Sequence, residues 1–137
     1  MTTTFEFLKE NIGATPYHKW LKPELIAVDD DKNLVTIRLQ IRPDLCRLEG
    51  TTDLHGGVVS ALVDIAGHAA VAGKLRHTVA TIDMRVDYLR LAGGSFVEAT
   101  ASIVKLGRTI GVVDIRIEDD KKRLVAVGRA SYLTAHI

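Results

Sequence analysis

The chain has 137 residues, 47% hydrophobic and 26% charged, which is enough for one globular domain with its own core over residues 1–137. Its 18 Lys and Arg nearly balance 17 Asp and Glu, and the two signs are interspersed. This balance gives no reason to expect nucleic acid or an anionic membrane surface as a partner. The single cysteine, Cys46, excludes an internal disulfide and a cysteine-rich zinc site.

Two further features bear on where the protein resides. Residues 1–12 contain acids and lack the apolar segment of a signal peptide. The longest apolar run, 58–73, is shorter than the roughly 18 to 20 residues that span a bilayer. We therefore expect a cytoplasmic protein that does not bind a membrane.

The first part of the chain predicts a short helix, a β-hairpin and an irregular segment. The helix places its apolar residues on one face, and Gly13 followed by Pro16 ends it. Apolar and polar residues alternate in the second hairpin strand, as in a half-buried antiparallel strand. The predicted segments are the helix 5–12, the strands 25–28 and 34–41 joined by an acidic turn at 29–33, and the irregular segment 42–54, in which Pro43 closes the hairpin.

The second part predicts one buried helix over 57–74, followed by strands only. The helix is rich in small residues, which suits close wrapping by a curved sheet. The order of elements fits the α+β class, with one curved antiparallel sheet around a long central helix. The other face and the edges of such a sheet need cover, which predicts an oligomer. The four expected strands are 80–91, 96–106, 110–118 and 123–134.

Three polar residues of the apolar helix, Ser60, Asp64 and His68, are spaced by four and therefore lie on one stripe. An ionised carboxylate there is unfavourable unless it is paired or used. Asp64 is either a buried acid paired with His68 or Arg85, or a catalytic group. Gly57 lies at the helix N-terminus, where unpaired N–H groups carry a partial positive charge; it either binds a substrate oxygen or only shapes the helix entry.

Two other kinds of site are not favoured. A metal site built from His55, Asp64 and His68 is conceivable, but the chain has no His-Glu-x-x-His pattern. Ser60 is not part of a G-x-S-x-G turn, so a Ser-His-Asp triad is not indicated, and it more plausibly packs the helix. We expect no metal and no stored cofactor.

The segment Leu54-His55-Gly56-Gly57 followed by Asp64, together with the strand segment 81–90 and Gly107-Arg108, resembles the hotdog-fold acyl-CoA thioesterases. The resemblance covers about residues 25–134 and is greatest to the phenylacetate-degradation group, the PaaI-like proteins. It implies hydrolysis of an acyl-CoA to a free acid and CoA. It also implies a homodimer or a homotetramer, with active sites between subunits.

The resemblance implies catalytic roles for three residues, and His55, directly before the helix, is a fourth candidate. Asp64 acts as general base or nucleophile, and the Gly57 N–H polarises the thioester carbonyl. Thr81 contributes a hydroxyl from the neighbouring subunit. His55 lies close to the substrate carbonyl or fixes the preceding loop.

The family usually has Asn or Gln about six residues before the motif His, where this chain has Glu49. The amide residues of this chain, Asn11, Asn33 and Gln40, are not close to that position in the sequence. Glu49 is therefore expected to lie at the substrate. Because a carboxylate replaces the amide, this chain is not expected to orient water or the carbonyl in the usual way of the family.

We expect His68 to face the same cavity as Asp64 and to touch the substrate or orient water. CoA carries several phosphates, which require basic groups at the mouth of its site. Arg90, Lys105 and Arg108, at strand ends or turns, are candidates, with Arg108 favoured; the alternative is that they are solvated turn residues.

Two other functions remain open at this point. A non-catalytic acyl-CoA-binding module would explain Glu49 in place of the amide. A hotdog hydratase or dehydratase would use a His and an acid across a dimer, but the His-Gly-Gly entry argues against it. The acyl group is aromatic or medium-chain aliphatic, and the sequence does not decide between them.

Overall fold

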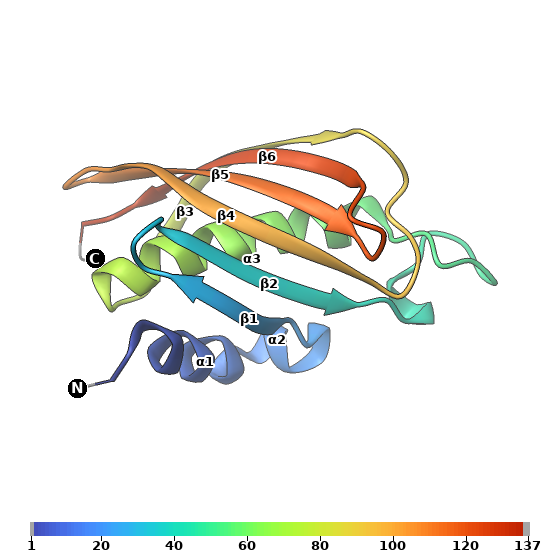
Figure 1. Cartoon of the computed structure of the whole chain (residues 1–137), viewed down its shortest axis with the longest axis horizontal. Coiled ribbons are helices and arrows are strands. Elements are labelled where there is room, and N and C mark those ends of the chain that lie inside the picture. Colours follow the sequence, from blue (N-terminus) through green and yellow to red (C-terminus); the bar gives the residue numbers. More distant parts are fainter. Residues whose placement is uncertain (1, 136–137) are drawn as a thin grey trace.

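The computed structural model describes residues 2–135 and shows one long helix packed along a six-stranded antiparallel sheet (Figure 1). The α+β architecture predicted from the sequence is confirmed. In chain order the elements are α1 (Thr4–Ala14), α2 (Pro16–Leu21), β1 (Glu24–Asp29), β2 (Leu34–Gln40), a 3-10 turn η1 (Pro43–Leu45), α3 (Gly56–Leu75), β3 (Ala80–Tyr88), β4 (Phe96–Leu106), β5 (Ile110–Asp119) and β6 (Leu124–Leu133).

The strands lie in the order β1-β2-β4-β5-β6-β3, so β1 and β3 are the two edges. Alternate residues of β4 and β5 point toward α3 and are buried, because the side-chain period of a strand is two. β3 has only β6 as a neighbour, and most of its residues are exposed. The buried inner residues of the two central strands include Val97, Ala99, Ala101, Val113, Ile115 and Ile117.

Helix α3 forms the centre of the core. Its C-terminus is closed by Arg76 in the left-handed conformation (φ 61°), whose N–H donates to the Ala72 carbonyl at 2.7 Å. Gly67 lies against the Tyr132 hydroxyl, which occupies the space that a Cβ at position 67 would need. Within residues 2–135, α3 alone is long and apolar enough to cross a membrane, but it is the mostly buried core helix of this fold.

The N-terminal region contains two helices where the sequence predicts one. Gly13 does not end α1, which continues to Ala14, and Pro16 begins α2 instead of marking a loop. Proline is favoured at the first position of a helix because its missing N–H would have no partner there. α1 packs on α3 through Leu8 and Ile12, both of which are buried.

One predicted strand is too long. The sequence extends the strand that became β3 to residue 91, but it ends at Tyr88. The N–H groups of Leu89 and Arg90 both donate to the Val125 carbonyl, which ends the regular ladder. Residues 89–95 then form a loop that passes the N-terminus of α3.

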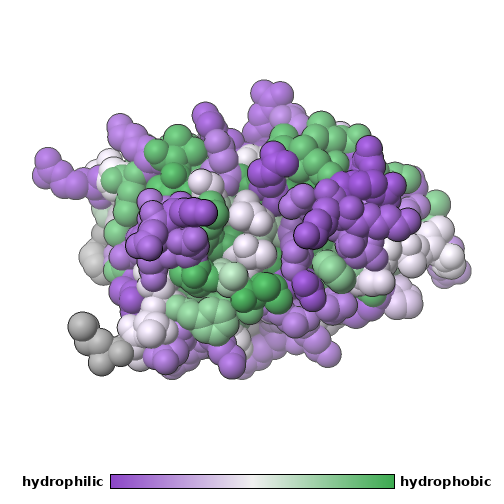
Figure 2. All heavy atoms as spheres, in the orientation of Figure 1, coloured by the Kyte–Doolittle hydropathy of each residue, from purple (hydrophilic) through white to green (hydrophobic). Residues whose placement is uncertain are grey.

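Exposed large hydrophobic residues are concentrated on β3 and the loop after it. The view in Figure 2 shows a largely hydrophilic surface on which hydrophobic side chains form separate areas between charged ones. A chain that leaves an apolar strand edge exposed presents a surface on which another strand can pair. The exposed large hydrophobic residues of this region are Ile82, Met84, Tyr88, Leu89 and Leu91.

Candidate active site

Two cavities lie along the side of α3 that faces β3. The first, called the amide cavity here, has a volume of about 390 Å³ and is lined by Gly56, Tyr88 and Arg90 among others. The second, called the Asp64 cavity, has a volume of about 220 Å³ and is lined by Asp64 and Thr81. Gly56, the first residue of α3, and the predicted carboxylate Asp64 of one chain therefore line different cavities, and the predicted oxyanion donor Gly57 lines neither of the two.

Asp64 is half-buried and accepts hydrogen bonds from two hydroxyl groups. The Oγ1 atom of Thr81 donates to Asp64 Oδ1 at 2.7 Å, and the Tyr132 hydroxyl lies 3.1 Å from the same oxygen. The expected alternative partner Arg85 pairs with Asp87 at 3.2 Å instead. Among the described residues, Asp64 Oδ2 has no hydrogen-bond partner, so this oxygen is available to a ligand.

The bond from Thr81 is made within one chain. The family resemblance implies that this hydroxyl comes from a neighbouring subunit, but β3 places Thr81 beside Asp64 of its own α3. Thr81 is exposed on its strand, so the pair lies at the surface of a single chain. A second subunit is not needed for the contact itself.

Sequence reasoning missed Tyr132, which is fully buried on β6. Its hydroxyl lies 3.0 Å from the Asp64 carbonyl oxygen as well as close to the carboxylate. Burial, and secondarily the charge of Asp64, raises the pKa of Tyr132 well above its usual range, so the phenol stays protonated. Tyr132 lies far from Asp64 in the sequence. The alternation of apolar and polar residues in its strand indicated only that Tyr132 belongs to the core.

His68 lies one turn after Asp64 and lines the same cavity, as predicted. The N–H of Val79 donates to His68 Nε2 at 3.3 Å, so Nδ1 carries the proton of the neutral ring. Burial lowers the pKa of His68 below its ordinary value of 6.5, and the charge of Asp64 offsets this only in part. The neutral form is therefore favoured.

At the N-terminus of α3, His55 caps the helix. Its Nδ1 atom accepts the N–H of Gly57 at 2.9 Å. The predicted oxyanion donor is therefore already occupied within the chain. The N–H of Gly56, the first helical residue, has no acceptor among residues 2–135.

Tyr88, at the end of β3, covers the first turn of α3. Its hydroxyl donates to the Gly56 carbonyl at 2.8 Å and makes a short contact with Ser60 Oγ. Ser60 therefore binds a neighbouring side chain, and does not only pack the helix as expected. Sequence reasoning assigned no role to Tyr88, although it lies in the strand segment that carries the family resemblance.

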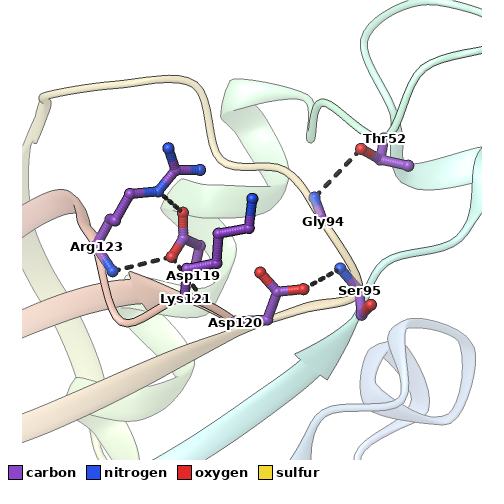
Figure 3. A network of polar contacts seen from close by, with 7 residues as sticks. All are labelled: Thr52, Gly94, Ser95, Asp119, Asp120, Lys121 and Arg123. Atoms are coloured by element: carbon purple, nitrogen blue, oxygen red, sulfur yellow. Dashed lines mark hydrogen bonds and ion pairs between the residues drawn. The ribbon is translucent and has the colours of Figure 1, made fainter.

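A polar network holds the segments next to the helix N-terminus. In Figure 3 the N–H of Gly94 donates to Thr52 Oγ1 at 3.2 Å, and the N–H of Ser95 donates to Asp120 Oδ2 at 2.9 Å. These bonds join the loop 89–95 to the segment before His55 on one side and to the β5–β6 turn on the other. The position of the helix entry thus depends on three separate parts of the chain.

The β5–β6 turn is itself fixed by a buried carboxylate. Asp119 accepts from Arg123 Nε at 2.8 Å and from the N–H groups of Lys121 and Arg123 (Figure 3). Burial raises the pKa of Asp119, but the hydrogen bonds from Arg123 and Lys121 outweigh it and hold this pKa below the ordinary value of 3.8. The carboxylate stays ionised at neutral pH.

The predicted substrate-binding residues fall in different places. Arg90 lines the amide cavity together with Arg47, which sequence reasoning missed. Glu49 is exposed in a turn and lines neither of the two cavities. Arg108 is exposed in the β4–β5 turn, which lies at the opposite end of α3 from its N-terminus (Figure 1).

Two residues of the N-terminal helices complete the Asp64 cavity. Asn11 of α1 and His18 of α2 both line it. No local motif indicates them, because they lie more than 40 positions before Asp64 in the chain. Within residues 2–135, no group of three His, Cys, Asp or Glu side chains is arranged to hold a metal ion.

This arrangement has the parts that acyl transfer requires. A carboxylate with one free oxygen can act as base or nucleophile, and an unpaired N–H at a helix N-terminus can stabilise a developing oxyanion. Both lie beside the edge strand β3. The arrangement is compatible with hydrolysis of an ester or a thioester.

Comparison with known proteins agrees with this assignment. The model of the thioesterase superfamily matches residues 52–126, more than half of the chain. The chain is 26% identical over 133 residues to the medium/long-chain acyl-CoA thioesterase YigI of Escherichia coli K12, covering 86% of this chain and 84% of YigI. It is 42% identical over 93 residues to a Halobacterium salinarum protein named as an esterase, but the match spans only 61% of each protein.

Solved structures show the same fold. An X-ray structure of a thioesterase-superfamily protein is 31% identical, with a TM-score of 0.89 over 96% of this chain and 98% of that one. The E. coli PaaI protein, at 22% identity, shares the fold with a TM-score of 0.82 over 95% of this chain and 91% of that one. The resemblance stated from the sequence is confirmed: this chain belongs to the thioesterase superfamily and has the hotdog fold.

Proposed function

We propose that this protein is an acyl-CoA thioesterase, which hydrolyses a thioester to a carboxylic acid and CoA. The carrying observation is Asp64, a carboxylate with one oxygen held by two hydroxyl groups and the other free in a cavity. An acid placed in an apolar core helix is unfavourable without a use. The acyl-CoA thioesterase activity named for YigI supports the thioester as substrate.

In this proposal Asp64 acts as general base on a water molecule or attacks the thioester carbonyl directly. In the first case a C–O bond forms from water to the carbonyl carbon, and Asp64 takes the proton. The C–S bond then breaks, and the CoA thiolate takes a proton as it leaves. Thr81 and Tyr132 hold Asp64 Oδ1, which leaves Oδ2 for the reaction.

The oxyanion forms at the N-terminus of α3. The sequence points to the Gly57 N–H, but that group donates to His55 Nδ1 in the free chain. Gly56 lines the amide cavity and its N–H is unpaired among the described residues, so this N–H is the donor that we propose. Gly57 can contribute only if His55 turns away from the helix end.

The separation of the two cavities supports a dimeric active site. β3 borders both, with Thr81 near its start in the Asp64 cavity and Tyr88 at its end in the amide cavity. Antiparallel pairing of two β3 strands about Met84 would set the start of one against the end of the other. The Asp64 cavity of one copy would then meet the amide cavity of the second.

Arginine residues near the amide cavity are the proposed binding groups for the CoA portion of the substrate. Arg47 and Arg90 line the amide cavity and offer positive charge to CoA phosphates. Arg108 remains a candidate for this role only from the second subunit of a dimer, because it lies at the other end of its own chain. We propose a cytoplasmic homodimer or a homotetramer built from two such dimers.

The test is free-thiol release from a panel of aromatic and aliphatic acyl-CoAs. Turnover by the wild type should fall by about 10²- to 10⁴-fold in Asp64→Asn, because the amide is neither a base nor a nucleophile. Asp31→Asn, an exposed turn residue, is the matched control and should keep full activity. Acyl-CoA binding without any turnover by the wild type would instead favour the non-catalytic binding module.

The oxyanion donor has a test of its own. Gly56→Pro removes the N–H while keeping the helix start, because proline is tolerated at the first helical position. Gly56→Ala keeps the N–H, and its Cβ would make ordinary contact with the Tyr88 ring at 3.6 Å. A loss of kcat in the proline variant that the alanine variant does not share would support Gly56; equal activities would exclude it.

A further inference from the structure

Glu49, which stands where the family resemblance implies an amide, is exposed and lines neither of the two cavities. We propose that Asn11, on α1, supplies the missing group and orients the attacking water at Asp64, with His18 of α2 as second partner of that water. The proposal rests on the proposed thioesterase function. It assigns a reaction role to helices that lie outside the region matched by the family model.

The first argument is the position and state of Asn11. It is half-buried and lines the same 220 Å³ cavity as Asp64 and Thr81. Its backbone carbonyl accepts from Thr15 Oγ1 at 3.2 Å, but its side-chain amide has no hydrogen-bond partner among residues 2–135. No buried side-chain N or O atom of residues 2–135 lacks a hydrogen-bond partner, so the Asn11 amide is open to solvent and can bind a water molecule or a substrate group in this cavity.

The second argument concerns the direction of the His18 ring. Its Nδ1 lies 3.0 Å from the Ile12 carbonyl, and because a carbonyl only accepts, Nδ1 carries the proton. In the neutral ring Nε2 then has a free lone pair. His18 also lines the Asp64 cavity, together with His68.

These groups form a complementary set around one water molecule. Asp64 Oδ2 and His18 Nε2 accept its two protons, while the Asn11 NH₂ donates to its oxygen. One lone pair remains to attack the carbonyl carbon. As the C–O bond forms, one proton passes to Asp64. If Asp64 instead attacks the carbonyl first, the same water hydrolyses the resulting anhydride, and its proton is again taken by a cavity group.

The rest of α1 holds Asn11 in place without taking part. Leu8 and Ile12 are buried against α3, and the Thr3–Glu6 capping box fixes the start of the helix. Asn11 therefore projects from a rigid element packed directly on the helix that carries Asp64. A rigid support is what a water-orienting group needs, because small displacements reduce the rate strongly.

The test compares Asn11→Ala with Gln40→Ala. The control variant removes an exposed amide at the end of β2, a strand that lies next to the sheet edge opposite β3. In Asn11→Ala we expect kcat to fall by about 10²-fold, with KM changed by less than about threefold. The thermal midpoint should stay within about 3 °C of the wild type, since no intramolecular bond of the side chain is lost. Gln40→Ala should match the wild type in all three quantities.

A double-variant experiment separates water orientation from a structural role. In an Asp64→Asn background, Asn11→Ala should cause no further loss of turnover, because both residues act on the same water. A structural role would instead lower the activity by the same factor in both backgrounds. His18→Phe should also be non-additive with Asn11→Ala.

Two results would overturn the inference, and they differ from failure of the proposed function. If Asn11→Ala keeps kcat within twofold while Asp64→Asn is inactive, the enzyme is a thioesterase but Asn11 does not orient its water. If Asn11→Ala raises KM and leaves kcat unchanged, Asn11 binds the substrate instead. If the wild type itself turns over no acyl-CoA, the proposed function fails, and this inference with it.

Discussion

The Tyr132 hydroxyl and the Asp64 carboxylate lie 3.1 Å apart, although 68 positions separate the residues in the sequence. The phenol is fully buried, and it fits against α3 only because position 67 is glycine. Tyr132 therefore fixes Asp64 from the core side while Thr81 fixes it from the edge strand. Two different strands of the sheet, β3 and β6, therefore hold the carboxylate of α3.

Tyr132→Phe tests this relationship. The variant keeps the ring but removes a hydrogen bond to a charged group, a change worth about 1.5–3 kcal/mol. We expect kcat to fall by about tenfold and the thermal midpoint to fall by several degrees, measured by thiol release and by thermal unfolding. Tyr17→Phe, at an exposed position, should leave both unchanged. Unchanged kcat in Tyr132→Phe would show that this bond is not used in the reaction.

His68 predicts a pH dependence of stability. Its pKa in the folded chain is lowered by burial, so between that pKa and 6.5 the unfolded chain binds a proton that the folded chain does not. The free energy of unfolding should therefore be fully retained above pH 6.5 and should decrease as the pH falls below it. Thermal unfolding between pH 5 and 8 should show a smaller slope for His68→Phe; equal slopes would contradict the assignment.

The composite active site predicts complementation between two inactive variants. If Asp64 of one chain acts with Gly56 of the other, a mixed dimer of Asp64→Asn and Gly56→Pro contains one site with both groups intact. Refolding the two variants together should restore about half of the wild-type turnover per mixed dimer, which is about a quarter for a random mixture of the two chains. No recovery, with mixed dimers shown by mass spectrometry, would place both groups in one chain.

The exposed edge strand predicts how the assembly can be broken. Met84→Pro would remove a backbone N–H and distort β3, and it would also disturb the pairing of β3 with β6 within the chain. A charged substitution on β3 is therefore the better test of the assembly. Ile82→Lys, at a residue that is 52% exposed, should shift the protein to monomer and reduce turnover in parallel. Analytical ultracentrifugation measures the first and thiol release the second. Full activity in a monomer would contradict the two-chain site.

The β5–β6 turn predicts a stability effect at a distance from the reaction. Asp119→Ala leaves the N–H groups of Lys121 and Arg123 without their acceptor and should lower the free energy of unfolding by about 2–4 kcal/mol. Because the pKa of Asp119 is lowered in the folded chain, this contribution is present above pH 3.8 and is lost as the pH falls below it. Urea unfolding measures the effect, with Asp31→Ala as the control; an equal loss in both variants would refute it.

The sequence was sufficient to predict the fold and the positions of Asp64 and His68 in the candidate site. The spacing of apolar residues predicted the central helix and five strands closely. One face of a strand and one stripe of a helix are buried, and each gives a regular spacing of apolar residues along the chain. The sequence also placed His68 beside Asp64, since residues four apart share a helix face. It failed at Pro16, which can end one helix or begin another, and at Leu89–Leu91, where apolar residues lie in a loop.

By itself, the sequence determined that this protein is an α+β chain with an acid in its core helix and a glycine pair at that helix's N-terminus. Only the tertiary structure decided which groups surround the acid. Tyr132 contacts Asp64, and Asn11 and His18 line its cavity, all from elements far away in the chain, whereas Glu49 does not line that cavity. The tertiary structure also showed that His55 occupies the Gly57 N–H. Local spacing encodes which face a residue takes, whereas contacts between distant segments depend on how the sheet, the loops and the N-terminal helices pack around α3.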